Sequence, residues 1–264
     1  ANIYHNRAVE LFGEPFPYAG QIIGVVEDDS WAIDNAYYNP VLKEVHFGRG
    51  KNSFYNLGRS ASVIKHEWQH FITEELFGLG FQRGEGVAPE WEFDPEQYSD
   101  SDAMQEGLSD YFAGDDQNDP WMAPRLLKDG RAYLRNIDKD LSAANDWIEE
   151  MHYAGEVFGA ALWDLRALLG SQETADLVFG TFDNYHPTAF QDFLGSMLRF
   201  DDRLPTGDNN ILNGTPHFRE IYTAFSLEHE FTGLSVQRAL LSFDDDDEGA
   251  SRGNGNGMIE PGER

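Results

Sequence analysis

The sequence predicts an α+β protein of two lobes, with a small N-terminal β-sheet, a central helix and a mainly helical C-terminal half. Short β-branched and aromatic runs separated by turn residues occupy residues 1–60. Apolar residues spaced three and four apart dominate residues 61–243. Residues 244–264 are rich in Asp, Gly and Asn, which is typical of a tail or linker.

The first 60 residues are predicted to form a short helix and then a small sheet. Residues 2–13 contain the helix, and the apolar run at 22–26 is typical of a strand. Residues 34–40 and 43–48 are predicted to be two strands joined at Asn39-Pro40. His46 alternates with apolar neighbours on the second of these strands, so we expect it to be structural.

The central helix is predicted over residues 61–77, with Ser60 as its N-cap and glycines at 78 and 80 ending it. His66 and His70 lie four residues apart, so they project from one face of this helix. Glu67 lies beside them. In zinc hydrolases this spacing lets both imidazoles bind one ion while the carboxylate acts on a water molecule. The alternative is an amphipathic helix with two ordinary polar histidines.

A second helix over residues 103–113 supplies the groups that such a site still needs. Glu106 and Asp110 lie four residues apart and share one face of this helix. Glu106 can be the third metal ligand, and Asp110 can orient a ligand imidazole. The chain has no cysteine, so any zinc must be held by histidine and carboxylate. We therefore predict that zinc is bound by His66, His70 and Glu106. We also predict that Asp110 orients the ring of His66 and that Gln105 orients the ring of His70.

These two segments together resemble the thermolysin and fungalysin group of zinc endopeptidases, whose third ligand comes from a similar Glu-x-x-Ser-Asp segment. The segment Asn-Ala-Tyr-Tyr-Asn at 35–39 resembles the family's edge strand, which binds the substrate backbone. Residues 151–158 are similar to the fungalysin segment that carries a second catalytic histidine, here His152. Leu134-Arg135-Asn136 resembles a segment whose arginine holds the substrate carbonyl.

The resemblance implies a two-lobed thermolysin-like fold and a secreted zinc endopeptidase. Glu67 would be the general base, and His152 and Arg135 would meet the oxyanion or the adjacent carbonyl. Asn35 and Ala36 would bind the peptide backbone. The specificity pocket would be apolar and lined by Phe54, Val63 and Leu134. Such a pocket would favour a bulky hydrophobic residue on the amine side of the scissile bond. The alternative is that these three residues belong to the hydrophobic core.

This sequence departs from the family at two positions. Phe81 stands where thermolysin has a tyrosine that helps to stabilise the oxyanion, and Ser62 stands where it has an aspartate calcium ligand. The family's paired-calcium site is therefore not expected here. The residue that orients His152 stays open among three acidic candidates, which are Asp146, Glu149 and Glu150.

The C-terminal half is predicted to contain further helices, at residues 155–169, from 171, at 189–200, at 218–227 and at 234–241. His186, His217 and His229 fall at turns or helix ends, where we expect solvent exposure or capping. Residues 83–102 are predicted to form a long loop over the site.

The formal charge of −28 makes nucleic acids and anionic membranes improbable partners. The resemblance implies protein or peptide substrates, and we expect a monomer. The tail at 244–264 has oxygen-bearing residues in a pattern similar to a calcium loop, but Arg252 occupies the first ligand position, and an acidic linker explains the tail equally well. Two alternative functions remain. One is an inactive, calcium-dependent binding or adhesion module, and the other is a zinc aminopeptidase that anchors the substrate amine at Asp34.

Overall fold

The computed structural model describes residues 22–29, 33–77, 99–146, 148, 150–203, 207 and 214–231. Several predictions fall outside these residues. They concern the helices at 2–13 and 234–241, the loop at 83–98, Phe81, Glu149 and the tail at 244–264.

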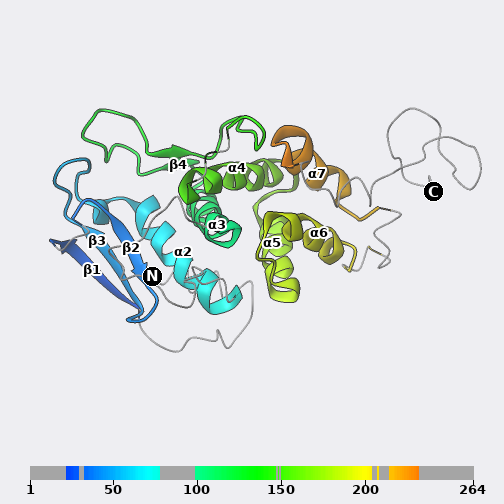
Figure 1. Ribbon diagram of the computed structural model, residues 1–264, viewed down its shortest axis with the longest axis horizontal. Helices are drawn as coiled ribbons and strands as arrows, with labels where there is room; N and C mark the ends of the chain where they lie inside the picture. Colours follow the sequence, from blue (N-terminus) through cyan, green and yellow to red (C-terminus); the bar gives the residue numbers. More distant parts are fainter. Residues whose placement is uncertain are drawn as a thin grey trace, which may run out of the picture.

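The N-terminal lobe is a three-stranded sheet of β1 (Ile23–Asp28), β2 (Ala36–Asn39) and β3 (Glu44–Gly48) (Figure 1). The three predicted strands are confirmed. The strand order is β1-β3-β2, with β3 parallel to β1 and antiparallel to β2. β2 is therefore an edge strand, with one side unpaired within the described sheet.

The sheet packs on the central helix α2 (Ala61–Phe77), which has the predicted bounds. Tyr38 on β2 contacts the ring of Phe71 at 5.9 Å and donates a hydrogen bond of 2.6 Å to Glu74. Lys43 adds a 2.9 Å ion pair to Glu74. These contacts place the edge strand along the helix that carries the two histidines.

The start of α2 differs in detail from the expected cap. A short 3-10 turn, η1 (Leu57–Arg59), precedes Ser60, whose carbonyl accepts the hydrogen bond from Ile64 N at 3.1 Å. The Ser60 hydroxyl pairs with Ser62 Oγ at 2.9 Å, and Ser62 Oγ also accepts from Ala123 N at 2.9 Å. Ser62, at the position of the family's calcium aspartate, thus makes hydrogen bonds within the protein.

Helices α3 (Asp100–Gln117) and α4 (Met151–Leu169) pack closely because glycines line their crossing. A Cβ on Gly155 would lie 2.7 Å from the Glu106 Cβ and 2.8 Å from the Ala103 carbonyl oxygen. α3 begins at a capping box between Ser99 and Asp102 and extends beyond the predicted 103–113. α4 begins four residues before the predicted 155, so its first turn carries His152.

The rest of the chain completes a mainly helical lobe. A two-stranded ribbon joins β4 (Trp121–Met122) to β5 (Arg135–Asn136), and the remaining elements are α5 (Ser171–Tyr185), α6 (Phe190–Asp201), α7 (Phe218–Tyr222) and the π-helical turn η4 (Thr223–Glu228). Phe158 on α4 lies at the centre of an aromatic cluster with Phe190, Phe193, Phe225 and Phe231. The predicted mixed α+β class is confirmed at this level.

The three histidines of this lobe differ from one another. His186 caps α5 in a left-handed conformation, as expected of a capping residue. His217 precedes α7 and pairs with Asp201 at 2.7 Å. His229 lies at the C-terminal end of η4, as expected, but it is fully buried and makes two hydrogen bonds, so the expected solvent exposure is wrong. Within the described residues, every helix is too short or too polar to cross a membrane.

Candidate metal centre

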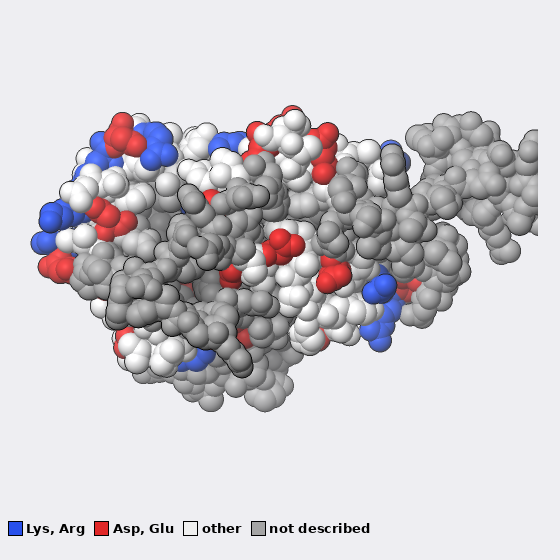
Figure 2. Space-filling model, viewed as in Figure 1, with Lys and Arg blue, Asp and Glu red and all other residues white. Residues whose placement is uncertain are grey.

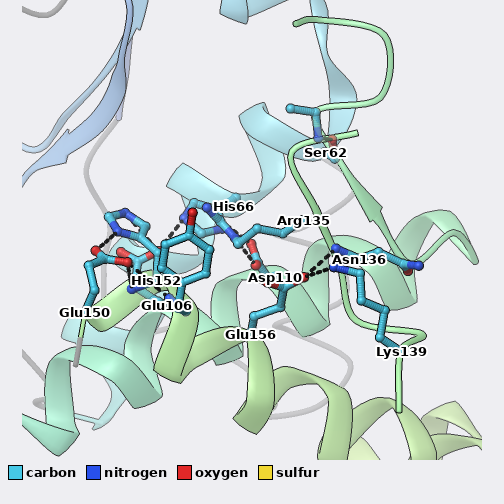
Figure 3. Close-up of polar contacts among 12 residues, drawn as sticks. Ser62, His66, Glu106, Asp110, Arg135, Asn136, Lys139, Glu150, His152 and Glu156 are labelled. Carbon is cyan, nitrogen blue, oxygen red and sulfur yellow. Dashed lines mark hydrogen bonds and ion pairs between the residues drawn. The ribbon is translucent and has the colours of Figure 1, made fainter. Parts of the chain in front are cut away.

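His66 and His70 on α2 meet Glu106 on the antiparallel helix α3. Figure 3 shows His66 beside Glu106. The two Nε2 atoms lie 3.1 Å apart. His66 Nε2 is 3.2 Å from Glu106 Oε2, and His70 Nε2 is 3.4 Å from Glu106 Oε1. The structure thus brings the three predicted ligands together, and all three are buried.

The residues of this group fit zinc. A tetrahedral ion with bonds of about 2.0–2.1 Å separates its ligand atoms by about 3.3–3.4 Å, close to the three distances found. Within the described residues, buried Glu106 Oε2 accepts no well-formed hydrogen bond and has only the ring nitrogens of His66 and His152 nearby, which a bound cation would compensate. Two imidazoles and one carboxylate are also a common ligand set of catalytic zinc. The group can therefore hold a metal ion.

The second ring nitrogens of the two histidines are held by α3. His66 Nδ1 lies 2.7 Å from Asp110 Oδ1, in the predicted contact. His70 Nδ1 lies 3.2 Å from the Ser109 hydroxyl, so the prediction that Gln105 orients His70 is not borne out. The Gln105 amide nitrogen is buried with no hydrogen-bond partner among the described residues. The signal for Ser109 is its spacing, because it lies one turn after Glu106 and shares its face.

Arg135 on β5 forms a fork against Asp110. Its Nε and Nη2 donate to the two carboxylate oxygens at 2.6 and 2.8 Å. Both side chains are buried, and the pKa of Asp110 is lowered to about 2, because the Arg135 charge and hydrogen bonds outweigh the opposing effect of burial. Arg135 therefore supports the carboxylate behind His66, a contact that the resemblance did not predict. Its contact with a substrate carbonyl stays a prediction.

A hydrogen bond from α4 places the strand that carries Arg135. Glu156 Oε1 accepts from Asn136 N at 2.9 Å and from Lys139 Nζ at 3.1 Å (Figure 3). Glu156 thus holds β5 against the helix that also carries His152.

The protonation of the ligands is compatible with a bound cation. Burial lowers the pKa of His70 to about 4, so its Nε2 carries a lone pair at neutral pH. Burial also disfavours charge on His66, but Asp110 and Glu106 more than compensate and raise its pKa to about 10. The same negative surroundings favour a divalent cation in place of that proton. The pKa of Glu106 is well below its usual value, because the three nearby histidines overcome burial.

Glu67 lies in the same buried region. Burial is the largest cause that raises its pKa, and repulsion from Glu106 adds to it, giving a value of about 7. A carboxylate that titrates near neutrality is suited to accept and return a proton. The arrangement therefore places a carboxyl group of raised pKa beside a group that can hold a metal ion.

His152, in the first turn of α4, faces the same site. Its Nε2 lies 3.6 Å from Glu106 Oε2, and its Nδ1 lies 2.6 Å from Glu150 Oε1. Glu150 is therefore the acidic partner among the three candidates, whereas Asp146 accepts from Ser142 N at 2.9 Å. Burial lowers the pKa of His152, but the nearby Glu106 and Glu150 raise it by a larger amount, so the net shift is upward.

The predicted substrate-binding residues divide into two groups. Asn35 and Ala36 lie at the start of edge strand β2. Val63 is in the hydrophobic core, and Phe54 and Leu134 pack against that core. The apolar pocket thus stays a prediction.

Neither the protein-family models nor the curated proteins that were searched match this chain. What the structure defines is the site, a buried His-His-Glu group able to hold a metal ion with the buried Glu67 carboxyl group beside it.

Proposed function

We propose that this protein is a zinc-dependent endopeptidase with a thermolysin-like arrangement of its site. The observation that carries the proposal is the convergence of His66, His70 and Glu106 at ligand spacing with Glu67 buried alongside. A metal group used only for structure has no need for a base of raised pKa. The net charge of −28 is consistent with a secreted protein, which we include in the proposal.

When bound, zinc supplies Lewis acidity toward the peptide carbonyl and toward a water molecule. Glu67 accepts the proton of that water as it attacks the carbonyl, and then donates the proton to the leaving amine. Its pKa of about 7 suits both transfers near neutral pH. Asp110 and Ser109 hold the two imidazoles with their Nε2 atoms near each other and Glu106, where these atoms would hold the ion.

His152 is suited to stabilise the developing oxyanion. Glu150 holds its Nδ1, which leaves Nε2 directed toward the region of Glu106. Glu106 and Glu150 raise the pKa of His152, which favours the protonated ring, and a protonated Nε2 would donate a hydrogen bond to negative charge on the substrate.

Strand β2 can bind an extended peptide at the edge that is unpaired among the described residues. Gly48 N donates to Asn35 O, so residue 35 faces β3, and Ala36 faces the other way by the alternation of an antiparallel pair. The N–H and C=O of Ala36 are therefore directed at the unpaired edge. A peptide added there would extend the sheet beside α2, which carries the metal ligands.

The two alternative functions fit less well. An aminopeptidase needs a free carboxylate for the substrate amine, but Asp34 accepts hydrogen bonds from the backbone N–H groups of Lys51, Asn52 and Phe54 at 2.6, 2.7 and 3.3 Å. A binding or adhesion module of the same fold has no use for Glu67 as a base. Both readings predict no cleavage inside a protein chain.

The deciding experiment compares casein hydrolysis and zinc content of the protein with those of Glu67→Gln. We expect one zinc at this site in both, and a loss of rate of about 10²–10⁴-fold in the variant. Glu74→Gln, on the same helix but paired with the sheet, is the matched control and should retain the rate. Equal hydrolysis by Glu67→Gln and the parent protein would refute the role of Glu67. Cleavage-site profiling then tests the preference for hydrophobic residues.

A further inference from the structure

A second group of metal-ligating side chains lies on the other part of α4. Asp164 on α4, Glu228 at the end of η4 and the following His229 each offer one ligand atom, and these atoms lie within 4.8 Å of one another. Asp164 is three turns after His152, which corresponds to about 18 Å along the helix. The two groups are therefore separate.

His229 has the geometry of a ligand histidine. It is fully buried, and its Nδ1 donates to the Leu141 carbonyl oxygen at 2.5 Å. A carbonyl can only accept, so Nδ1 carries a proton and Nε2 is left to face Asp164 Oδ2 at 2.8 Å. Metal-ligating histidines typically donate their second N–H to a backbone carbonyl or carboxylate in this way.

The carboxylates of this group face each other as well. Glu228 is hydrogen-bonded to the Asp164 carboxyl group, and the charges of Asp164 and Asp140 both oppose negative charge on Glu228. Among the described residues, no lysine or arginine pairs with Asp164 or Glu228. Acidic side chains are also prominent on the surface around α7, next to η4 (Figure 2). An imidazole nitrogen and two carboxylates thus converge with only protons or a cation available to join them.

We propose that Asp164, Glu228 and His229 form a second divalent-metal site, which Zn²⁺ occupies as a structural ion. Imidazole is a good ligand for zinc and a poor one for calcium, which prefers oxygen alone. The site joins three segments, because Ala143 N also donates to the His229 carbonyl at 2.9 Å and so ties the loop before α4 to the end of η4. The Asp164 side chain is 33% exposed, which gives the ion access from solvent.

Zinc titration of the full chain, after chelation and in excess Ca²⁺ to occupy sites made of carboxylates alone, tests this proposal. We expect two equivalents in the parent protein and one in Asp164→Asn, with zinc affinity at the second site at least about tenfold weaker. Glu106→Gln should retain the second site and lose the first. Asp192→Asn removes an exposed carboxylate on α6 and is the control that should keep both.

Glu228→Gln separates a metal from a shared proton. The amide still donates to Asp164, so a group joined by protons keeps its stability and shows no dependence on zinc. If zinc joins the group, zinc raises the Tm of Glu106→Gln, which keeps only the second site. This rise in Tm should then be lost when Glu228→Gln is added to Glu106→Gln.

The outcomes also separate this proposal from the proposed function. If the parent protein binds one equivalent of zinc, and Asp164→Asn keeps this zinc while Glu106→Gln loses it, the second site would be overturned and the endopeptidase proposal would stand. If the single equivalent of zinc is lost in Asp164→Asn and kept in Glu106→Gln, the second site would be supported and the endopeptidase mechanism would be refuted. Two equivalents in every variant would show adventitious binding to surface carboxylates and overturn the second site.

Discussion

The Glu150 carboxylate contacts both the imidazole ring and the backbone N–H of His152. One carboxylate oxygen lies 2.6 Å from His152 Nδ1, and the other accepts from the backbone N–H groups of His152 and Tyr153 at 3.1 and 3.2 Å. The same side chain thus caps α4 and sets the orientation of the histidine in its first turn. The start of this helix and the proposed oxyanion side of the site depend on one residue.

Substitution of Glu150 should separate these two roles. Glu150→Gln keeps an oxygen that can accept from the helix N–H groups but removes the charge beside His152, so we expect kcat to fall about tenfold or more with little change in unfolding free energy. Glu150→Ala removes the cap too and should cost about 1 kcal/mol of stability in addition. Peptidase kinetics and urea unfolding check both values. Unchanged kcat in both variants would contradict the positioning role.

Ser109 should contribute to zinc affinity through His70. Ser109→Ala removes the hydroxyl that lies 3.2 Å from His70 Nδ1, and we expect zinc binding to weaken about 10–100-fold. Ser101→Ala is a matched control, because Ser101 is a buried serine on the same helix whose hydroxyl has no hydrogen-bond partner among the described residues. Competition with a zinc chelator measures both variants. A similar loss in the two serine variants would indicate a packing effect and not an orienting one.

The Arg135–Asp110 pair should behave as a coupled unit. Because both groups are buried, Arg135→Met leaves the Asp110 carboxylate without its fork, and we expect a loss of about 3–5 kcal/mol in unfolding free energy. The double variant with Asp110→Asn should be less destabilised than the sum of the single variants. Chemical denaturation of the four proteins measures the coupling. Additive losses would show that Arg135 acts elsewhere.

Asp34 gives a prediction for pH dependence. Burial acts to raise its pKa, but hydrogen bonds from the backbone N–H groups of Lys51, Asn52 and Phe54 prevail and lower it from 3.8 to about 2. A carboxyl group with a lowered folded pKa stabilises the fold above its unfolded pKa, and this contribution is lost as the pH falls toward the folded value. Asp34→Ala should therefore be less stable than the parent at pH 6, and the difference should shrink between pH 4 and pH 2. Urea unfolding across this range measures it, and a constant difference would contradict the assignment.

The open edge of β2 should bind the substrate backbone. Ala36→Pro removes an N–H that faces away from β3, which an edge strand tolerates, so we expect a higher KM for peptides with a nearly unchanged Tm. Tyr37→Pro removes an N–H directed at β3 and should lower the Tm instead. Unchanged KM in Ala36→Pro would exclude this N–H from substrate binding.

Local sequence patterns predicted the elements that carry the site. The i, i+4 spacing of His66 and His70 requires only that residues 61–77 are helical, and they are. Glu106 and Asp110 likewise share a face of α3 because both lie on one helix. The expected helix starts were less accurate, because α4 begins at Met151 under the Glu150 cap and not at 155.

The choice of partners depended on packing between elements. Ser109 takes the contact with His70 that the sequence suggested for Gln105, because the antiparallel approach of α2 and α3 decides which side chain reaches the ring. His229 is separated from Asp164 by 65 residues, and no local pattern predicts that they meet.

The sequence by itself determined which three residues could hold a metal ion, because spacing on a single helix is a local property and the absence of cysteine limits the donors to histidine and carboxylate. Only the tertiary structure decided that Glu150 orients His152, that Arg135 forks onto Asp110, and that a second group surrounds His229. The physical reason is that these contacts join separate elements. Their geometry follows from how closely the helices and loops pack, as at Gly155 against Glu106.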